Sequence, residues 1–331
     1  MVAGGMKLRR SGRNPILKPR GDDWEALAVF NCAAIERGSR IYLLYRAVGE
    51  YREYVSRLGY AVLDRELNLV ERSSEPVFGP DVRLWEMSIE DPRLVEVEGK
   101  GEVYMTYVTT PTPAPPAAVR LKLGLPKPQQ AHPRAAVARL KGFWEFERLG
   151  VITPYDAEER DVVLFPKKFD GRFAVLHRPA NWVGSGYPVS APSIWFAWLD
   201  GIPGVMHGHR VVMEPEEEWE ASKIGAGPPP IETEEGWLLI YHGVDENNVY
   251  RAGAALLDPR EPWKVIARTR EPILEPEEEY EREGDVPNVV FPEGAVVLDG
   301  ELLVFYGAAD KVCCVASATL NEVLDALMSS A

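Results

Sequence analysis

One pattern of about sixty residues occurs five times along this chain, and it constrains the fold more than any other feature. Each unit contains a short apolar strand that ends on an aromatic or imidazole ring, followed by a second apolar strand. The five rings are separated by 62, 70, 64 and 65 residues and are Tyr45, Tyr107, His177, Tyr241 and Tyr306. The first strand of each unit is predicted to begin at Asn31, Asp91, Asp161, Gly227 and Asn288.

Several short strands per unit, separated by polar turns, are typical of the blades of a β-propeller. A β-sandwich has no reason to repeat in this way, and a helical solenoid would show a period of 3.6 residues. We therefore expect an all-β fold, a five-bladed β-propeller in which residues 1–331 form a single domain.

Two segments depart from the repeat. The second unit contains an insertion, residues 111–134, with seven prolines and several Lys and Arg residues, which we expect to form a semi-rigid loop outside the propeller core. After the last strand, Leu320, Val323, Leu324 and Leu327 are spaced for one face of a short C-terminal helix that packs against the last blade.

The composition excludes several classes of partner. A net charge of −14 over 331 residues argues against a nucleic acid or an anionic membrane. No basic N-terminal segment is followed by an apolar run, and no run has the length of a membrane span. The cysteines are Cys32, Cys313 and Cys314, of which the last two are neighbours and poorly placed for an ordinary disulfide, so we expect reduced, buried thiols in a cytoplasmic protein. The sequence leaves the oligomeric state open, with a homo-oligomer among the alternatives.

The stretch Ser88-Ile-Glu-Asp-Pro-Arg93 places two carboxylates beside a proline and a guanidinium. Asp-Pro favours an extended or turn backbone, so Glu90 and Asp91 are expected to point to opposite sides, with Arg93 paired to one of them. This arrangement suits an acid held in a pocket. A polar turn with a surface ion pair is the alternative interpretation.

Ionisable side chains follow three of the five rings, namely Arg46, Arg178 and His242. Because equivalent positions of different blades meet around the axis, these side chains and the polar residues at the first strands predict a central pocket. Arginines combined with an imidazole favour an anion, since their N–H groups match phosphate oxygens. His207-Gly-His209 has no third ligand at suitable spacing, so no metal site is expected, and a polar turn is the better interpretation.

Six motifs, in this order along the chain, resemble glycoside hydrolase family 130, the β-mannoside phosphorylases and related mannosidases, whose fold is a five-bladed propeller. They are Ser88-Ile-Glu-Asp-Pro-Arg93, Asp161-Val-Val-Leu-Phe-Pro-Lys-Lys168, Leu176-His-Arg-Pro179, Ser222-Lys-Ile-Gly-Ala-Gly-Pro-Pro-Pro230, Tyr241-His-Gly243 and Gly284-Asp-Val-Pro-Asn288. The resemblance runs from about Asn14 to Leu327 and leaves residues 111–134 without a counterpart.

The resemblance implies an inverting phosphorolysis, in which inorganic phosphate attacks a non-reducing β-mannosyl unit and releases α-mannose 1-phosphate. Asp91 matches the catalytic acid, which acts through the mannose 3-hydroxyl. Phosphate is a co-substrate, and no cofactor is expected. The phosphate-binding positions are Arg160, Arg178 and His242, with Lys168 as a helper. The substrate-binding positions are Asn31, Arg46, Lys223 and Asp310 near the mannose, Tyr250 and Asn288 on the acceptor side, and Glu90 in the predicted pocket. Cys32 stands where the family pattern has a small polar residue.

Two alternatives remain. The hydrolase branch of the family lacks the phosphate-binding cations, all of which are present here, so the sequence favours a phosphorylase. A non-catalytic propeller that docks proteins would need an exposed apolar rim rather than charges at the axis. Among substrates we expect β-1,4-mannooligosaccharides first, then mannosyl-glucose, mannosyl-N-acetylglucosamine and β-1,2-mannobiose.

Overall fold

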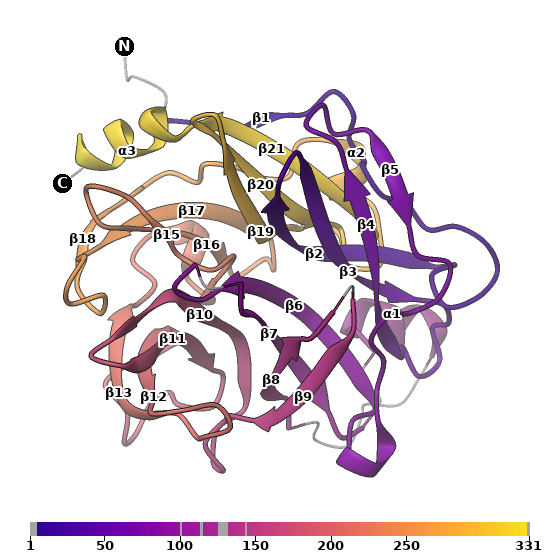
Figure 1. Cartoon of the computed structure of the whole chain (residues 1–331), viewed down its shortest axis with the longest axis horizontal. Helices are drawn as coiled ribbons and strands as arrows, with labels where there is room; N and C mark the ends of the chain where they lie inside the picture. The colour runs from indigo at the N-terminus through magenta and orange to yellow at the C-terminus, as the bar shows by residue number, and fades with distance from the viewer. Residues whose placement is uncertain (1–4, 100, 113–114, 125–131, 143, 330–331) are drawn as a thin grey trace.

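The structure is a computed structural model that describes residues 5–99, 101–112, 115–124, 132–142 and 144–329. Within these ranges the strands form five antiparallel sheets arranged around a centre (Figure 1). The five-bladed propeller predicted from the repeat is therefore confirmed.

Each blade is one antiparallel sheet, and in blades 1 to 3 the strands lie side by side in chain order from the axis outward. Blade 1 contains β2 (Ala28–Arg37), β3 (Arg40–Val48), β4 (Ser56–Leu63) and β5 (Leu69–Arg72). Blade 2 contains β6 (Ser88–Glu96), β7 (Val103–Thr110), β8 (Arg134–Leu140) and β9 (Phe146–Val151). Blade 3 contains β10 (Glu159–Phe169), β11 (Arg172–Pro179), β12 (Ile194–Leu199) and β13 (His207–Met213).

Blade 4 contains β14 (Lys223–Ala226), β15 (Ile231–Glu232), β16 (Trp237–Val244), β17 (Tyr250–Leu257) and β18 (Val265–Arg268). Blade 5 contains β19 (Val290–Leu298), β20 (Glu301–Ala308) and β21 (Val312–Thr319), and its outer strand is β1 (Arg9–Arg10) from the start of the chain. Because the first and last strands of the chain pair in one sheet, blade 5 closes the ring. Short helical turns η1 (Val82–Leu84), η2 (Glu218–Glu220) and α2 (Glu279–Arg282) lead into blades 2, 4 and 5.

The apolar core lies between neighbouring blades, with one cluster of buried side chains at each of the five interfaces. Side chains alternate along each strand, so one sheet supplies two clusters. In β20, for example, Leu302 and Val304 face blade 4 while Leu303 and Phe305 face blade 1. Burial on both faces explains why these strands read as nearly continuous apolar runs.

The innermost strands of blades 1, 2 and 3 contain a backbone irregularity that the sequence did not reveal. Asn31, Asp91 and Asp161 lie inside β2, β6 and β10, not at their starts, and have φ angles of 48°, 51° and 55°. Each lies at a β-bulge, an irregularity that re-aims a side chain. Asn and Asp tolerate this left-handed backbone better than other non-glycine residues. The polar side chains at the axis are therefore placed by the bulges.

The predicted C-terminal helix is α3 (Leu320–Met328). Thr319 caps its N-terminus and exchanges hydrogen bonds with Glu322 in a capping box. Val323, Leu324 and Leu327 are buried in the cluster between blades 4 and 5, so the helix covers both blades and not the last one alone. β1 and α3 lie on the same side of the molecule (Figure 1).

The insertion contains a helix that was not predicted, α1 (Ala117–Leu123), between β7 and β8. Val119 is buried beside Phe30, Val48 and Tyr54, so a helix that belongs to blade 2 in sequence packs on blade 1. Residues 113–114 and 125–131 of the predicted loop lie outside the described residues.

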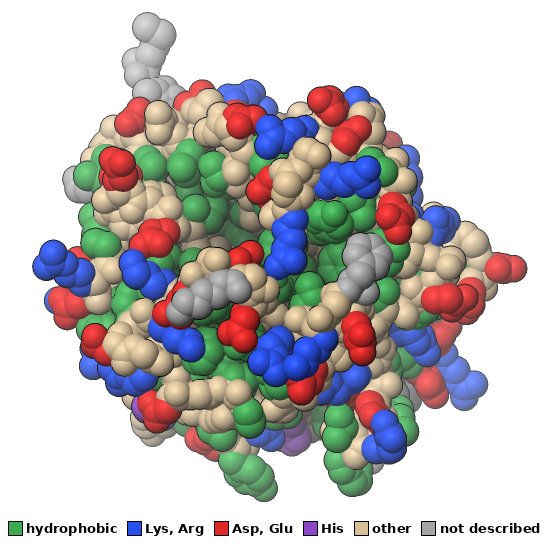
Figure 2. All heavy atoms as spheres, viewed as in Figure 1, with side chains coloured by type: hydrophobic (Ala, Val, Ile, Leu, Met, Phe, Trp, Pro, Cys, Tyr) green, Lys and Arg blue, Asp and Glu red, His purple; other side chains and the backbone are tan. Residues whose placement is uncertain are grey.

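Within the described ranges, no helix is long and apolar enough to cross a membrane. On the face of the molecule shown in Figure 2, acidic and basic side chains are interspersed and do not form separate patches.

Candidate active site

A polar pocket of about 520 Å3 lies at the propeller axis and receives side chains from all five blades. Ten of the twelve predicted site residues line it: Asn31, Arg46, Glu90, Asp91, Arg160, Arg178, Lys223, His242, Tyr250 and Asp310. The repeat thus brings together residues that are up to 279 positions apart in the chain, from Asn31 to Asp310.

Two predicted residues are not among those that line the pocket. Asn288 is exposed at the rim, where its carbonyl accepts a hydrogen bond from Tyr250 N at 3.0 Å and its neighbours Pro287 and Val289 line the pocket. Lys168 lies near the opposite end of β10 from Arg160, with its ammonium 4.4 Å from the ring centre of Phe173. Lys168 is too far along the strand to help bind a ligand in the pocket, since each strand residue advances about 3.3 Å.

Asp91 is buried and held by two donors. Asn31 Nδ2 and Arg46 Nη1 each lie 2.9 Å from Asp91 Oδ1. Burial would raise the pKa of Asp91, but the positive charges of Arg46 and Arg93 and the Asn31 hydrogen bond lower it below its ordinary value. Asp91 is therefore held as a carboxylate.

Glu90 points into the same pocket as Asp91, so the expectation that the two carboxylates face opposite sides is wrong. Glu90 Oε1 lies 3.2 Å from Arg46 Nη2, and Glu90 Oε2 lies 3.0 Å from Arg160 Nη1. The left-handed backbone at Asp91 turns its side chain back toward the side that Glu90 occupies. Arg46 consequently bridges the two acids.

Arg93 does not pair with the side chain of Glu90 or Asp91. It lies beneath the pocket, with Nη2 at 3.2 Å from Asp161 Oδ1 and Nη1 at 3.8 Å from Glu293 Oε1. Its Nη1 also donates to the backbone oxygen of Asp91 at 3.0 Å. Arg93 is therefore a buried link at the axis between blades 2, 3 and 5.

The cationic side of the pocket is organised by Asp161. Arg178 Nε and Nη2 each lie 2.6 Å from Asp161 Oδ2, and His242 Nε2 lies 3.7 Å from the same oxygen. Burial would raise the pKa of Asp161, but Arg178, His242 and Arg93 hold it far below its ordinary value. This fixed negative charge orients Arg178 before any ligand arrives.

His242 is fully buried, and neither ring nitrogen has a hydrogen-bond partner among the described residues. Burial, opposed in part by Asp161, lowers the pKa of His242 to about 3. The ring is therefore neutral at mildly acidic pH. Its free N–H can still donate a hydrogen bond to a ligand.

Lys223 and Asp310 have pKa values shifted toward neutrality. Burial and the nearby Arg178 lower the pKa of Lys223 to about 8, and its Nζ donates to Tyr250 Oη at 2.8 Å. Burial raises the pKa of Asp310 to about 7, and Asp91 adds to the shift while Arg46 opposes it. Perturbed pKa values of this kind gather at functional sites.

Glu293 at the axis was missed by sequence reasoning. Its side chain is fully buried, and neither oxygen has a hydrogen-bond partner in the described part of the chain. Burial raises its pKa well above the ordinary range despite Arg93 at 3.8 Å, so Glu293 is a neutral carboxylic acid. Glu293 is the only ionisable residue of the apolar strand β19, and this interruption is the sequence signal that could have marked it.

Two glycines make room for these polar groups. A Cβ at Gly307 would stand 1.9 Å from Asn31 Oδ1, and one at Gly225 would stand 2.4 Å from Asp161 Oδ2. This explains why the ring of blade 5 is followed by glycine instead of a charged residue. α1 adds the apolar wall of the pocket through Pro116, Ala117, Ala118 and Leu121.

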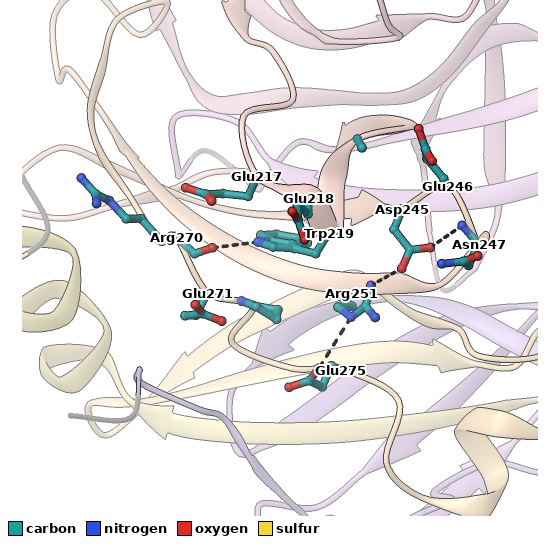
Figure 3. A pocket seen from close by; sticks show the side chains of 12 residues that line it. Glu217, Glu218, Trp219, Asp245, Glu246, Asn247, Arg251, Arg270, Glu271 and Glu275 are labelled. Carbon is teal, nitrogen blue, oxygen red and sulfur yellow. Dashed lines mark hydrogen bonds and ion pairs between the residues drawn. The ribbon is translucent and has the colours of Figure 1, made fainter. Parts of the chain in front are cut away.

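A second hollow, of about 780 Å3, lies at the edge of blade 4 (Figure 3). Its side chains largely satisfy one another: Arg251 Nη1 lies 2.9 Å from Asp245 Oδ2, and Trp219 Nε1 donates to the Arg270 oxygen at 2.8 Å. None of the predicted site residues lines it. In the described ranges, no three His, Cys, Asp or Glu side chains are grouped to hold a metal ion.

Fold and pocket together define a five-bladed propeller whose axial pocket has a carboxylate side and a cationic side. The family model of glycoside hydrolase family 130, described as beta-1,4-mannooligosaccharide phosphorylase, matches residues 7–329. The chain belongs to this family. The resemblance seen in the motifs is confirmed, and with it the expectation of an enzyme of the glycoside phosphorylase class.

Individual relatives are consistent with this assignment. A 1,2-beta-oligomannan phosphorylase of a Thermoanaerobacter species is 38% identical over 325 residues, which covers 96% of this chain and 99% of the relative. A beta-1,4-mannooligosaccharide phosphorylase of Ruminococcus albus is 41% identical over 180 residues, or 51% of each chain. The solved structure of a beta-1,2-mannobiose phosphorylase from Listeria innocua has the same fold, with a TM-score of 0.79 over 98% of this chain and 100% of that chain at 24% identity.

Proposed function

We propose that this protein is an inverting β-mannoside phosphorylase that transfers a non-reducing β-mannosyl unit to inorganic phosphate and yields α-mannose 1-phosphate. The observation that carries the proposal is the division of the pocket. Asp91 and Glu90 stand with Arg46 on one side, and Arg178 stands with His242 and Lys223 on the other. Such a pocket accommodates a neutral sugar beside an anion.

We assign phosphate to Arg160, Arg178 and the neutral His242. Arg178 is already oriented by Asp161, so it loses little freedom when it binds an oxyanion. The unpartnered nitrogens of His242 leave one N–H free to donate. Lys223, with its lowered pKa, adds a nearby ammonium at neutral pH. Lys168 is left out of the assignment because of its place on β10.

The mannosyl unit is assigned to the carboxylate side. Asn31 Oδ1 has no partner among the described residues and can accept a hydrogen bond from a sugar hydroxyl. Arg46, Glu90 and Asp310 supply further hydrogen-bonding groups. The acceptor sugar is assigned to the rim, between Tyr250 and Asn288 on one side and α1 on the other.

In the proposed reaction, a phosphate oxygen forms a bond to the anomeric carbon as the glycosidic C–O bond breaks. Asp91 supplies the proton that the leaving oxygen needs, through the mannose 3-hydroxyl. Positive charges, chiefly Arg46 and Arg93 and also Arg160, lower the pKa of Asp91 and favour its ionised form. A bound phosphate offsets part of this positive field and so raises the pKa of Asp91, which lets the acid hold a proton when both substrates are present. Phosphate is itself the nucleophile, so the reaction needs one acid and no cofactor.

For the linkage, the proposal places β-1,2-linked oligomannan before the β-1,4-mannooligosaccharides that the sequence had favoured. The support is the relative matched along almost its whole length, a 1,2-beta-oligomannan phosphorylase. The β-1,4 linkage stays as the second candidate, because the family model and the Ruminococcus albus relative are named for it. A panel of acceptor sugars with α-mannose 1-phosphate, assayed by phosphate release and product linkage, decides between them.

We also propose a cytoplasmic location, which the three free, buried cysteines favour. A homo-oligomer stays a proposal, which light scattering of the purified protein tests.

A further inference from the structure

A buried three-residue cluster recurs in the blades and accounts for the ring positions of the repeat. In four blades the ring is a tyrosine whose hydroxyl donates to a buried glutamate, and an arginine from the outermost strand pairs with that glutamate. In blade 4, Tyr241 Oη and Arg268 Nη2 each lie 2.6 Å from Glu220. The other three clusters are Tyr45–Glu25–Arg72, Tyr107–Glu86–Arg148 and Tyr306–Glu281–Arg10.

Blade 3 has the same arrangement with different chemistry. Its ring is His177, whose Nδ1 lies 2.7 Å from Glu159 Oε1, and His209 of the outermost strand takes the place of arginine. His209 Nδ1 lies 3.0 Å from His177 Nε2. Glu159 and His177 are fully buried, and Trp182 packs on both imidazoles.

The two histidines, in place of a tyrosine and an arginine, change how the negative charge of the buried glutamate is neutralised. An arginine stays charged at any pH a protein meets, whereas an imidazole is charged only when it carries a second proton. Among the described residues no arginine or lysine forms an ion pair with Glu159, and its Oε2 has no hydrogen-bond partner. The charge of Glu159 is therefore balanced only when the His177–His209 pair holds an extra proton.

The geometry of the pair allows one extra proton at most. The two nitrogens at 3.0 Å share a single hydrogen, and a second positive charge would repel the first. Burial and the adjacent His177 lower the pKa of His209 to about 4, with His207 acting in the same direction and Asp156 opposing it. Of the two rings, His177 is the one that contacts the carboxylate, with Nδ1 at 2.7 Å from Glu159 Oε1, so a positive charge on this ring lies nearest to Glu159.

The cluster stands directly beside the cationic side of the pocket. Glu159 precedes Arg160 in β10, His177 precedes Arg178 in β11, and Arg160 and Arg178 are opposite each other in the register of these strands (lower left in Figure 1). A change in the charge of the cluster acts on a strand pair whose next residues are the two arginines.

We propose that Glu159, His177 and His209 are positioning residues for phosphate: they fix the strand ends that carry Arg160 and Arg178 while the imidazole pair is protonated, and so add to the contacts of these arginines with Glu90 and Asp161. This inference rests on the proposed phosphorylase function. Loss of the proton at higher pH leaves a buried carboxylate unbalanced, which loosens the ends of β10 and β11. Phosphate binding weakens as a result, and mannoside binding on blades 1 and 2 does not.

The test replaces the blade 3 cluster by the one found in the other blades, in the double variant H177Y/H209R. KM for phosphate and KM for the mannoside are measured from pH 6 to 8.5 in both enzymes. The ionisation of phosphate itself contributes equally to both, so the comparison cancels it. We expect the KM for phosphate to rise about three- to tenfold more in the wild type than in the variant over this range, with parallel KM values for the mannoside. Superimposable phosphate profiles would overturn the inference.

Glu159→Gln covers the case in which the double variant does not fold, since a neutral amide needs no balancing charge and should also flatten the profile. Lys167→Gln, on β10 but exposed and outside the cluster, is the control and should keep the wild-type profile. NMR of 15N-labelled histidine in the wild type adds an independent readout. One proton should be lost from the His177–His209 pair within this pH range, and two rings that stay neutral throughout would overturn the proposal.

If the wild type needs no phosphate at all, the proposed function fails instead of this inference, so the two failures can be told apart.

Discussion

Arg46 Nη1 lies 2.9 Å from Asp91 Oδ1 while Nη2 of the same guanidinium lies 3.2 Å from Glu90 Oε1. One arginine thus holds two adjacent carboxylates of blade 2 on the same side of the axis. The arrangement lowers the pKa of Asp91, chiefly through the charge of Arg46, and so favours its ionised form. Replacement of Asp91 should therefore reduce catalysis strongly and change the stability of the fold little.

Asp91→Asn should lower kcat by about a hundredfold to ten-thousandfold, because the variant has no proton to deliver. The amide can accept the Arg46 and Asn31 hydrogen bonds through its oxygen, and asparagine tolerates the left-handed backbone, so the melting temperature should change little. Phosphorolysis rates of purified variant and wild type provide the check. Asp299→Asn is a matched control, since Asp299 has a φ of 49° and is exposed. Near-normal turnover in Asp91→Asn would exclude this residue as the acid.

Arg178→Ala should raise the KM for phosphate by about ten- to a hundredfold. A hydrogen bond to a charged group contributes about 1.5–3 kcal/mol, and loss of Arg178 also leaves Asp161 facing the phosphate. The KM for the mannoside should change much less, because Asn31, Arg46 and Asp310 come from other blades. Initial rates at varied phosphate measure the effect.

Arg172→Ala, at the far end of the same strand, is the control for the loss of an arginine from β11. Equal changes in both KM values in Arg178→Ala would show that the residue supports the whole pocket and not the phosphate.

Glu293→Gln should raise the free energy of unfolding above that of the wild type at pH 7, and should leave it unchanged near pH 4. The folded state keeps a proton on Glu293 that the unfolded chain releases above about pH 4.5, so the stability of the wild type falls as the pH rises through that value. Glutamine does not titrate, and the difference in unfolding free energy should exceed about 1 kcal/mol at pH 7 and vanish near pH 4. Urea unfolding at the two pH values measures it, with the exposed Glu234→Gln as control. A loss of stability at pH 7 would mean that Glu293 is ionised and balances Arg93.

Val119→Ser should weaken oligosaccharide binding with little effect on phosphate. Val119 is the buried contact between α1 and blade 1, and α1 forms the apolar wall of the pocket. We expect the KM for the mannoside to rise severalfold and the melting temperature to fall by only a few degrees, because α1 lies outside the five inter-blade clusters. Lys122→Ser, exposed on the same helix, should behave as wild type. An unchanged KM for all oligosaccharides would remove α1 from the site.

The repeat could be recognised because its ring residue contacts a buried glutamate in each blade, through a tyrosine hydroxyl in four blades and through His177 in blade 3. Tyr45, Tyr107, Tyr241 and Tyr306 each donate to a buried glutamate, so their spacing follows the blades. The glutamates Glu25, Glu86, Glu220 and Glu281 were missed, although they precede their tyrosines by 20, 21, 21 and 25 residues, and this spacing could have marked them. The polar pocket followed from ionisable residues next to the rings, where a core position would be apolar.

Other features depend on backbone geometry that spacing does not reveal. The left-handed conformation of Asp91 places Glu90 and Asp91 on one side, whereas strand alternation predicts two. Lys168 belongs to a motif that contains Asp161, but an extended strand carries it away from the axis. α1 lies in a proline-rich segment and packs on a blade other than its own, which is a tertiary contact without a local signal.

The central claim is that phosphate, and not water, is the nucleophile in this pocket. The most direct measurement is the product of a β-1,2-mannooligosaccharide incubated with the enzyme, with and without inorganic phosphate, analysed by 31P and 1H NMR. The account predicts α-mannose 1-phosphate in amounts equal to the mannosyl units released, and almost no reaction when phosphate is omitted. Free mannose formed equally fast without phosphate, from this substrate or from its β-1,4 counterpart, would contradict it.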